Sequence, residues 1–167
     1  MKPTSKIPFL TIILLLSTVV LYGQNNTVNG KLVLTAIQIN SICKSIDDSK
    51  RLVEGIAEGG FVNQKGGWET YDLKSKGGDT LFRIRHNSST DLYSKTTFYY
   101  FNKQLIKSSM EIEDWNSASK MKTVYSATYY FSDNKPIKVI NENTKHSTAS
   151  EMIRQGLSYQ NNFYHNQ

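Results

Sequence analysis

The feature that most constrains the fold is a series of short segments rich in Thr, Tyr, Phe, Val and Ile, which runs from Glu58-Gly59-Gly60 to about Asn143. Turn signals made of Gly, Asn and Asp separate these segments, as at Gly77-Gly78-Asp79 and Asp133-Asn134. Connections this short join neighbouring strands only in antiparallel fashion, because a parallel crossover needs roughly a dozen residues or more. We therefore predict an antiparallel meander, with strands at 54–64, 67–75, 80–87, 95–102, 105–114, 121–132 and 136–143.

A helix is expected on either side of this meander along the chain. From Lys31 to about Ile46, apolar residues recur at spacings of three and four, which corresponds to one face of a helix. This helix either ends at Asp47-Asp48-Ser49 or continues through Leu52 and Val53. The predicted fold class is α+β: an N-terminal helix packed on an antiparallel meander of about six or seven strands, with a short C-terminal helix.

The C-terminal helix is expected to begin near Ser150, with Ser147 or Thr148 as its cap. Gly156 falls within it, and glycine in a helix costs up to about 1 kcal/mol relative to alanine. The sequence therefore predicts a weak helix here, followed by a frayed tail.

Two segments, residues 97–107 and 128–138, repeat one hairpin pattern: an aromatic strand, an Asn-containing turn and an Ile-Lys return. In the first copy, counting across a two-residue turn places Tyr99 on the face expected to be buried and Phe98 and Tyr100 on the opposite face. The second copy needs a bulge or a wider loop to keep its aromatic residue and its Ile on one face.

The first 23 residues have the pattern of an export signal. Lys2 and Lys6 precede an apolar run from Ile7 to Leu21, which is shorter than the roughly 20 residues that a membrane-spanning helix needs. Gln24 follows Gly23 where a lipoprotein would carry cysteine, so we expect no membrane anchor after leader removal. We predict a protein exported to the periplasm or the extracellular space, with a signal peptide at 1–23, a polar linker at 24–30, a single α+β domain at 31–160 and a frayed tail at 161–167.

Charge and cysteine content exclude several classes of protein. The leader holds two of the 20 Lys and Arg residues and none of the 14 Asp and Glu residues, so the remaining chain has a formal net charge of +4. No block of consecutive Lys or Arg of the kind that marks a nucleic-acid-binding or membrane-binding tail is present, and we expect no nucleic-acid partner. Cys43 is the single cysteine, so no intramolecular disulfide forms, and its apolar neighbours favour a buried, unreactive thiol.

No catalytic, cofactor-binding or metal-binding motif of a known class is present. The acidic groups Asp47-Asp48 and Glu111 to Asp114 lack the alternating oxygen donors of a calcium loop. We therefore predict no catalytic residue, no cofactor and no metal ligand. Paired carboxylates of a glycoside hydrolase stay possible, because their separation is spatial and is not readable from sequence.

Tyrosines of the predicted strands are the first candidate binding residues. Consecutive aromatic residues in a strand must fall on both faces of the sheet. If helices cover one face, Tyr100 and Tyr130 are expected on the other, where tyrosine offers apolar area with a polar tip to a partner. The alternative is that these tyrosines only stabilise cross-strand ladders.

Arg83 and Arg85 are the second pair of candidate binding residues. By strand alternation they share one face, where two guanidinium groups can bind a carboxylate or a phosphate. The alternative is ordinary cross-strand pairing with acids such as Glu69 or Glu111.

The order of these features, including the hairpin sequence Tyr99-Tyr100-Phe101-Asn102-Lys103, resembles that of small exported proteins of Bacteroidetes. This resemblance implies a fold and a compartment and no activity. The layout of a helix on an antiparallel meander is also similar to that of cystatins and β-lactamase inhibitors, at the level of fold.

These observations favour an exported, non-catalytic binding or interaction domain that uses an aromatic-rich sheet face. Its partner would be a protein, a peptide or a glycan. Two alternatives stay open: a small hydrolase that acts on cell-envelope material, and an inhibitor of a secreted enzyme.

Overall fold

The computed structural model describes residues 26–28, 31–60, 66–89, 92–115 and 121–166, and the chain divides into two compact units, Met1–Val33 and Leu34–Gln167. In the first unit, strands β1 (Asn26–Val28) and β2 (Lys31–Val33) pair antiparallel. The segment expected as a polar linker thus contains a strand. The predicted signal peptide, residues 1–23, lies outside the described residues.

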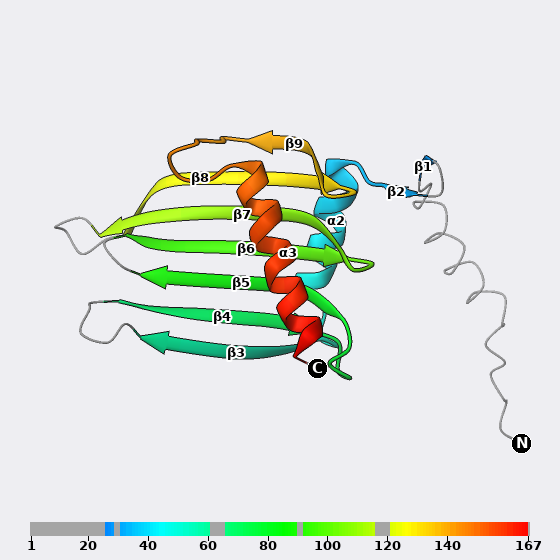
Figure 1. Ribbon diagram of the computed structural model, residues 1–167, viewed down its shortest axis with the longest axis horizontal. Coiled ribbons are helices and arrows are strands. Elements are labelled where there is room, and N and C mark those ends of the chain that lie inside the picture. The colour runs from blue at the N-terminus through cyan, green and yellow to red at the C-terminus, as the bar shows by residue number, and fades with distance from the viewer. Residues whose placement is uncertain (1–25, 29–30, 61–65, 90–91, 116–120, 167) are drawn as a thin grey trace, which may run out of the picture. The chain divides into compact units, whose positions relative to one another are not determined.

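The second unit is a seven-stranded antiparallel sheet in which the strands follow one another in sequence order, with a helix on each side (Figure 1). This confirms the predicted α+β meander. The elements are α2 (Ala36–Asp47), β3 (Val53–Gly60), β4 (Gly67–Lys74), β5 (Leu81–Ser89), β6 (Tyr93–Phe101), β7 (Gln104–Trp115), β8 (Met121–Ser132), β9 (Lys135–Ile140) and α3 (Ala149–His165).

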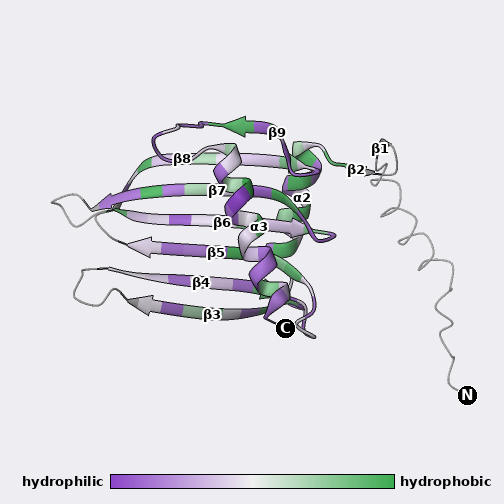
Figure 2. Cartoon of the chain, viewed as in Figure 1, coloured by the Kyte–Doolittle hydropathy of each residue, from purple (hydrophilic) through white to green (hydrophobic). Residues whose placement is uncertain are grey.

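Helix α3 covers one side of the sheet, here called the α3 side, and forms the main core with it. Thr148 is the N-cap and closes a capping box with Glu151, so one of the two predicted caps is confirmed. The helix alternates apolar and polar residues along its length (Figure 2), and it buries Met152 against the sheet. The core cluster consists of Leu81, Ile84, Phe98, Tyr100, Leu105, Ile112, Tyr125, Ala127, Tyr129, Phe131 and Met152.

Gly156 allows α3 to approach the sheet closely. A Cβ atom at this position would lie 2.8 Å from Leu105 Cδ2 and 3.0 Å from Phe98 Cδ1. Its carbonyl oxygen accepts a hydrogen bond of 2.8 Å from Tyr100 Oη. The glycine that weakens the isolated helix is therefore required for its packing. Helix α3 continues to His165, so much of the tail that was expected to fray is helical.

Helix α2 lies on the other side, here called the α2 side, and crosses strands β8 to β5 near one end of the sheet. Thr35 caps the helix, which ends at Asp47, so it does not continue through Leu52 and Val53. Asn40 Oδ1 accepts hydrogen bonds from Lys107 Nζ at 2.9 Å and from Tyr130 Oη at 3.3 Å. Asp47 receives one from Tyr99 Oη at 2.9 Å.

Both repeated hairpins have the same geometry. Asn102 and Lys103 have positive φ angles of 50° and 59°, as do Asp133 and Asn134 with 51° and 56°, which is the pattern of a type I′ turn. In each hairpin the register then shifts, after Tyr99 in the first copy and after Tyr130 in the second. Of the two possibilities for the second copy, a bulge or a wider loop, the structure has the bulge, and the first copy has one as well.

The bulge in the first hairpin overturns the predicted face assignment. Tyr99 pairs with Lys107 but Tyr100 pairs with Leu105, so one extra residue lies on the return strand. Counting residues across the turn without this bulge assigns the strand residues to the wrong sides of the sheet. Phe98 and Tyr100 therefore lie in the α3 core, whereas Tyr99 contacts α2.

The expected position of Tyr100 and Tyr130 on an uncovered face is also wrong. Tyr100 is fully buried under α3, and Tyr130 is 5 % exposed with its hydroxyl bonded to Asn40 of α2. The physical reason is that helices cover both sides of the sheet at this end, whereas the prediction assumed that one side is free.

Candidate functional site

The α2 side of the sheet continues well beyond α2, and we call this remainder the open face. Cross-strand pairing arranges its side chains in two neighbouring rows, since every second residue of a strand points to the same side. Neither row makes a described contact with α2. The rows are Ile56, Tyr71, Arg85, Thr97, Ser109 and Thr128, then Glu58, Glu69, Asn87, Lys95, Glu111 and Ser126. Tyr93 lies one row farther from α2, opposite Ser89 and Glu113.

Arg83 and Arg85 do share one side of β5, as alternation predicts, but their surroundings differ. Arg83 lies at the covered end, where its guanidinium forms ion pairs with Asp47 of α2 and Glu54 of β3. Its side chain is 15 % exposed. These acids are not Glu69 or Glu111, the pairing partners that the sequence suggested. Arg83 therefore joins α2 to the sheet and is not free to bind a ligand.

Arg85 lies on the open face. Its guanidinium carbon is 4.3 Å from the centroid of the Tyr71 ring, and its nearest carboxylate, Glu54, is 3.8 Å away. The Nε atom of Arg85 is buried and has no hydrogen-bond partner among the described residues. Of the two predicted arginines, Arg85 is the more exposed, with 32 % of its side chain accessible against 15 % for Arg83.

Glu69 is the centre of a small hydrogen-bonded cluster, the Glu69 cluster, which also contains Tyr71 and Asn87. Tyr71 Oη donates to Glu69 Oε2 at 2.7 Å, and Asn87 Nδ2 donates to the same oxygen at 3.3 Å. These two hydrogen bonds hold the pKa of the Glu69 carboxyl below its usual value. The carboxylate therefore stays charged, and its position is set by strands β4 and β5.

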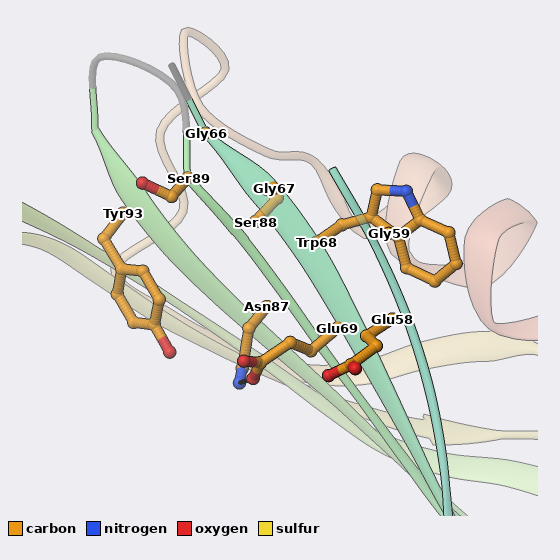
Figure 3. A pocket seen from close by; sticks show the side chains of 10 residues that line it. All are labelled: Glu58, Gly59, Gly66, Gly67, Trp68, Glu69, Asn87, Ser88, Ser89 and Tyr93. Atoms are coloured by element: carbon orange, nitrogen blue, oxygen red, sulfur yellow. Dashed lines mark hydrogen bonds between the residues drawn. The ribbon is translucent and has the colours of Figure 1, made fainter. Parts of the chain in front are cut away.

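A cavity of about 650 Å³ opens at the far end of these strands (Figure 3). The side chains of Glu58, Glu69 and Asn87 project from three neighbouring strands toward the same side, and Tyr93 stands beside them. Glu58 pairs directly opposite Glu69 across the strands. The lining residues are Glu58, Gly59, Gly66, Gly67, Trp68, Glu69, Asn87, Ser88, Ser89 and Tyr93.

A smaller cavity of about 330 Å³ lies on the α3 side at the same end of the sheet, lined by Trp68, Thr70, His86, Ser88 and Tyr159. His86 Nδ1 is 2.9 Å from Thr70 Oγ1, and burial lowers the pKa of His86. The ring lies between Trp68 and Tyr159, at centroid distances of 6.3 and 5.8 Å. His86 is held here by a hydroxyl and two aromatic rings, which is a packing role.

Cys43 is 4 % exposed on the sheet-facing side of α2, and burial raises the pKa of its thiol to about 12. A thiol this rarely ionised is a poor nucleophile. Across the described ranges, no group of three or more His, Cys, Asp and Glu side chains is placed to hold a metal ion. Neither helix in the described part of the chain combines the length and apolar character needed to cross a bilayer.

The residues that sequence reasoning missed are Glu58, Tyr71, Asn87 and Tyr93, while Glu69 was considered only as a partner for arginine. They come from four strands and share no local motif. Strand alternation could have shown that Tyr71 and Glu69 share one side of β4, and that Arg85 and Asn87 share one side of β5. Their meeting depends on the register between β4 and β5, which the sequence does not state.

No protein family, curated protein or solved structure matches this chain.

Proposed function

We propose that this protein is an exported, non-catalytic binding domain that meets its partner through the open face. The observation that carries the proposal is the Glu69 cluster with Arg85 beside it: charged and polar groups held in fixed positions on a part of the sheet that no described helix covers. The partner is a protein, a peptide or a glycan. Export is supported by the pattern of residues 1–23.

Three properties of the open face favour binding. Tyr71 is half-buried, so it can give a partner both ring area and a hydroxyl. The polar groups are already held by hydrogen bonds and by rigid strands, so little conformational entropy is lost when a partner is bound. Lys95 and Glu111, 3.5 Å apart, add charges of both signs along the same row.

The proposal is tested with an array of envelope glycans, peptides and secreted enzymes probed with the purified protein. Arg85→Ala is expected to lower capture of the preferred partner, because its guanidinium lies on the open face beside the Glu69 cluster and its ion pair with Glu54 is a long one, 3.8 Å. The matched control is Arg154→Ala, which removes an exposed arginine from α3 on the other side of the sheet. Capture that survives Arg85→Ala and is lost in Arg154→Ala would place the binding surface elsewhere.

A hydrolase is the second candidate, because Glu58 and Glu69 face one cavity from opposed positions. Glycoside hydrolysis needs one charged carboxylate and one that stays protonated in an apolar pocket. The lowered pKa of Glu69 suits the charged role, but Glu58 is exposed to solvent rather than enclosed by apolar groups. Release of reducing ends from envelope polysaccharide, abolished by Glu69→Gln, would establish the enzyme instead.

A further inference from the structure

We infer that Glu58, Glu69, Asn87 and Tyr93, here called the acidic corner, bind a primary ammonium group such as that of a lysine side chain. The inference rests on the proposed function, since it names the chemical group that the open face takes from its partner.

No close ion pair among the described residues neutralises the acidic corner, and Arg85 acts on Glu69 only at longer range. Like charges directly opposite each other on neighbouring strands destabilise a sheet, and Glu58 stands opposite Glu69. Glu58 is exposed and has no described partner. The two groups bonded to Glu69 are the neutral side chains of Tyr71 and Asn87, which satisfy its lone pairs without cancelling its charge.

The nearby cations of the open face are engaged elsewhere. Lys95, the neighbour of Asn87 on β6, has its Nζ atom 3.5 Å from Glu111. The Arg85 guanidinium lies over the Tyr71 ring and next to Glu54. A cation supplied by a ligand would therefore meet two carboxylates without competing with an existing close ion pair.

Asn87 adds a buried acceptor that lacks a hydrogen-bond donor within the described ranges. Its residue is only 7 % exposed, and its Oδ1 atom is buried without a hydrogen-bond donor among the described residues. The amide lines the cavity, and its Nδ2 atom is committed to Glu69. A buried acceptor without a donor costs free energy, and an ammonium group carries three donors and no acceptor.

Tyr93 completes the corner. Its half-buried ring stands beside Asn87 at the cavity (Figure 3), where the negative face of an aromatic ring attracts a cation. Two carboxylates, one amide oxygen and one ring match the three donors and the positive charge of an ammonium group. Among the described residues, the acidic corner is not part of a group of three or more His, Cys, Asp and Glu side chains placed to hold a metal ion.

The test is an NMR titration of the purified ¹⁵N-labelled protein with N-acetyl-lysine amide. The matched probe is N-acetyl-norleucine amide, which keeps the aliphatic side chain and lacks the ammonium group. We expect saturable shifts of the amides at 58, 69 and 87 with the lysine probe and none with norleucine. Glu58→Gln should lower the affinity for the lysine probe by about three- to fivefold, which is the effect of losing one partly exposed charge pair.

Asp114→Asn is the control variant, because it makes the same change in charge at an exposed carboxylate on β7 outside the cavity. It should leave affinity unchanged. Equal binding of both probes, unchanged affinity in Glu58→Gln, or shifts produced only by calcium chloride would each overturn the ammonium site. If Arg85-dependent capture on the array survives such a result, the binding domain stands and only the ligand group is wrong.

Discussion

The two sides of the sheet use the same strands and the same residue types, yet their tyrosines do different things. On the α3 side, Tyr100 and Tyr129 are fully buried in the core. On the open face, Tyr71 is half-buried and donates to a carboxylate within reach of solvent. The comparison teaches that an aromatic-rich strand does not by itself indicate a binding surface, because the position of the helices decides which tyrosines stabilise and which can bind.

The same lesson appears on a finer scale in β5. Arg83 and Arg85 are two residues apart on one side of one strand, but only Arg83 lies at the end that α2 covers. One arginine holds two carboxylates, and the other keeps part of its surface free. The edge of the surface that α2 covers thus falls between neighbouring rows of one sheet.

The largest effect is expected for Tyr100→Ala. It removes a fully buried ring and the hydrogen bond to the Gly156 carbonyl, and should lower the free energy of unfolding by about 3–5 kcal/mol. Tyr71→Ala, on the open face, should cost about 1 kcal/mol. Urea unfolding followed by circular dichroism measures both. Equal losses in the two variants would break the distinction between the two sides.

Gly156→Ala should be destabilising by about 1–3 kcal/mol, although alanine is the better helix former, because its Cβ would press on Leu105 and Phe98. Ser158→Ala, an exposed site on the same helix, is the control and should be neutral or slightly stabilising. Thermal unfolding of the pair shows the difference. A stabilised Gly156→Ala would mean that α3 does not approach the sheet this closely.

Arg83→Met should lower the free energy of unfolding by about 1–2 kcal/mol, a value already reduced for solvent screening at Asp47 and Glu54. Arg85→Met should cost less than about 1 kcal/mol, since its nearest carboxylate is farther away. Chemical unfolding at low and high salt measures both variants. The difference between their free energies of unfolding should be smaller at high salt. The opposite order would show that α2 does not depend on Arg83.

The smallest effect concerns pH and His86. Because burial lowers its pKa, the folded protein takes up a proton at His86 less readily than the unfolded chain does. Its contribution to stability is complete above the unfolded pKa of about 6.5 and is lost as the pH falls through the lower folded value. His86→Phe should flatten the stability profile in that window, whereas His165→Gln should not. An unchanged slope in His86→Phe would place the titrating group elsewhere.

Much of the fold is readable from the sequence because its signals are local. Turns are marked by residues that adopt positive φ angles, as at Asn102-Lys103 and Asp133-Asn134. Once the turns are placed, the ends of the strands between them are predicted to within a few residues. The side of the sheet to which Tyr100 points cannot be read from the sequence. A bulge of one residue leaves no separate signal in the sequence, and it exchanges the sides to which all residues beyond it point.

The site is less readable than the fold. Alternation correctly puts Arg83 and Arg85 on one side, but it does not show where α2 ends across the strands. Glu69 and Asn87 are distant in the chain and meet only through the register of β4 with β5. Without knowledge of that register, no sequence motif distinguishes Glu69 and Asn87 from other polar residues on the surface.

The central claim is that the open face is the binding surface. The most direct measurement is an NMR titration of this protein, labelled with ¹⁵N, with the partner selected on the array. We predict that the largest changes in the protein's amide shifts occur at residues 69, 71, 85 and 87, and that the changes become smaller toward the rows that α2 covers. Shifts confined to the exposed side of α3, or to strand β9 at the opposite edge of the sheet, would contradict the account.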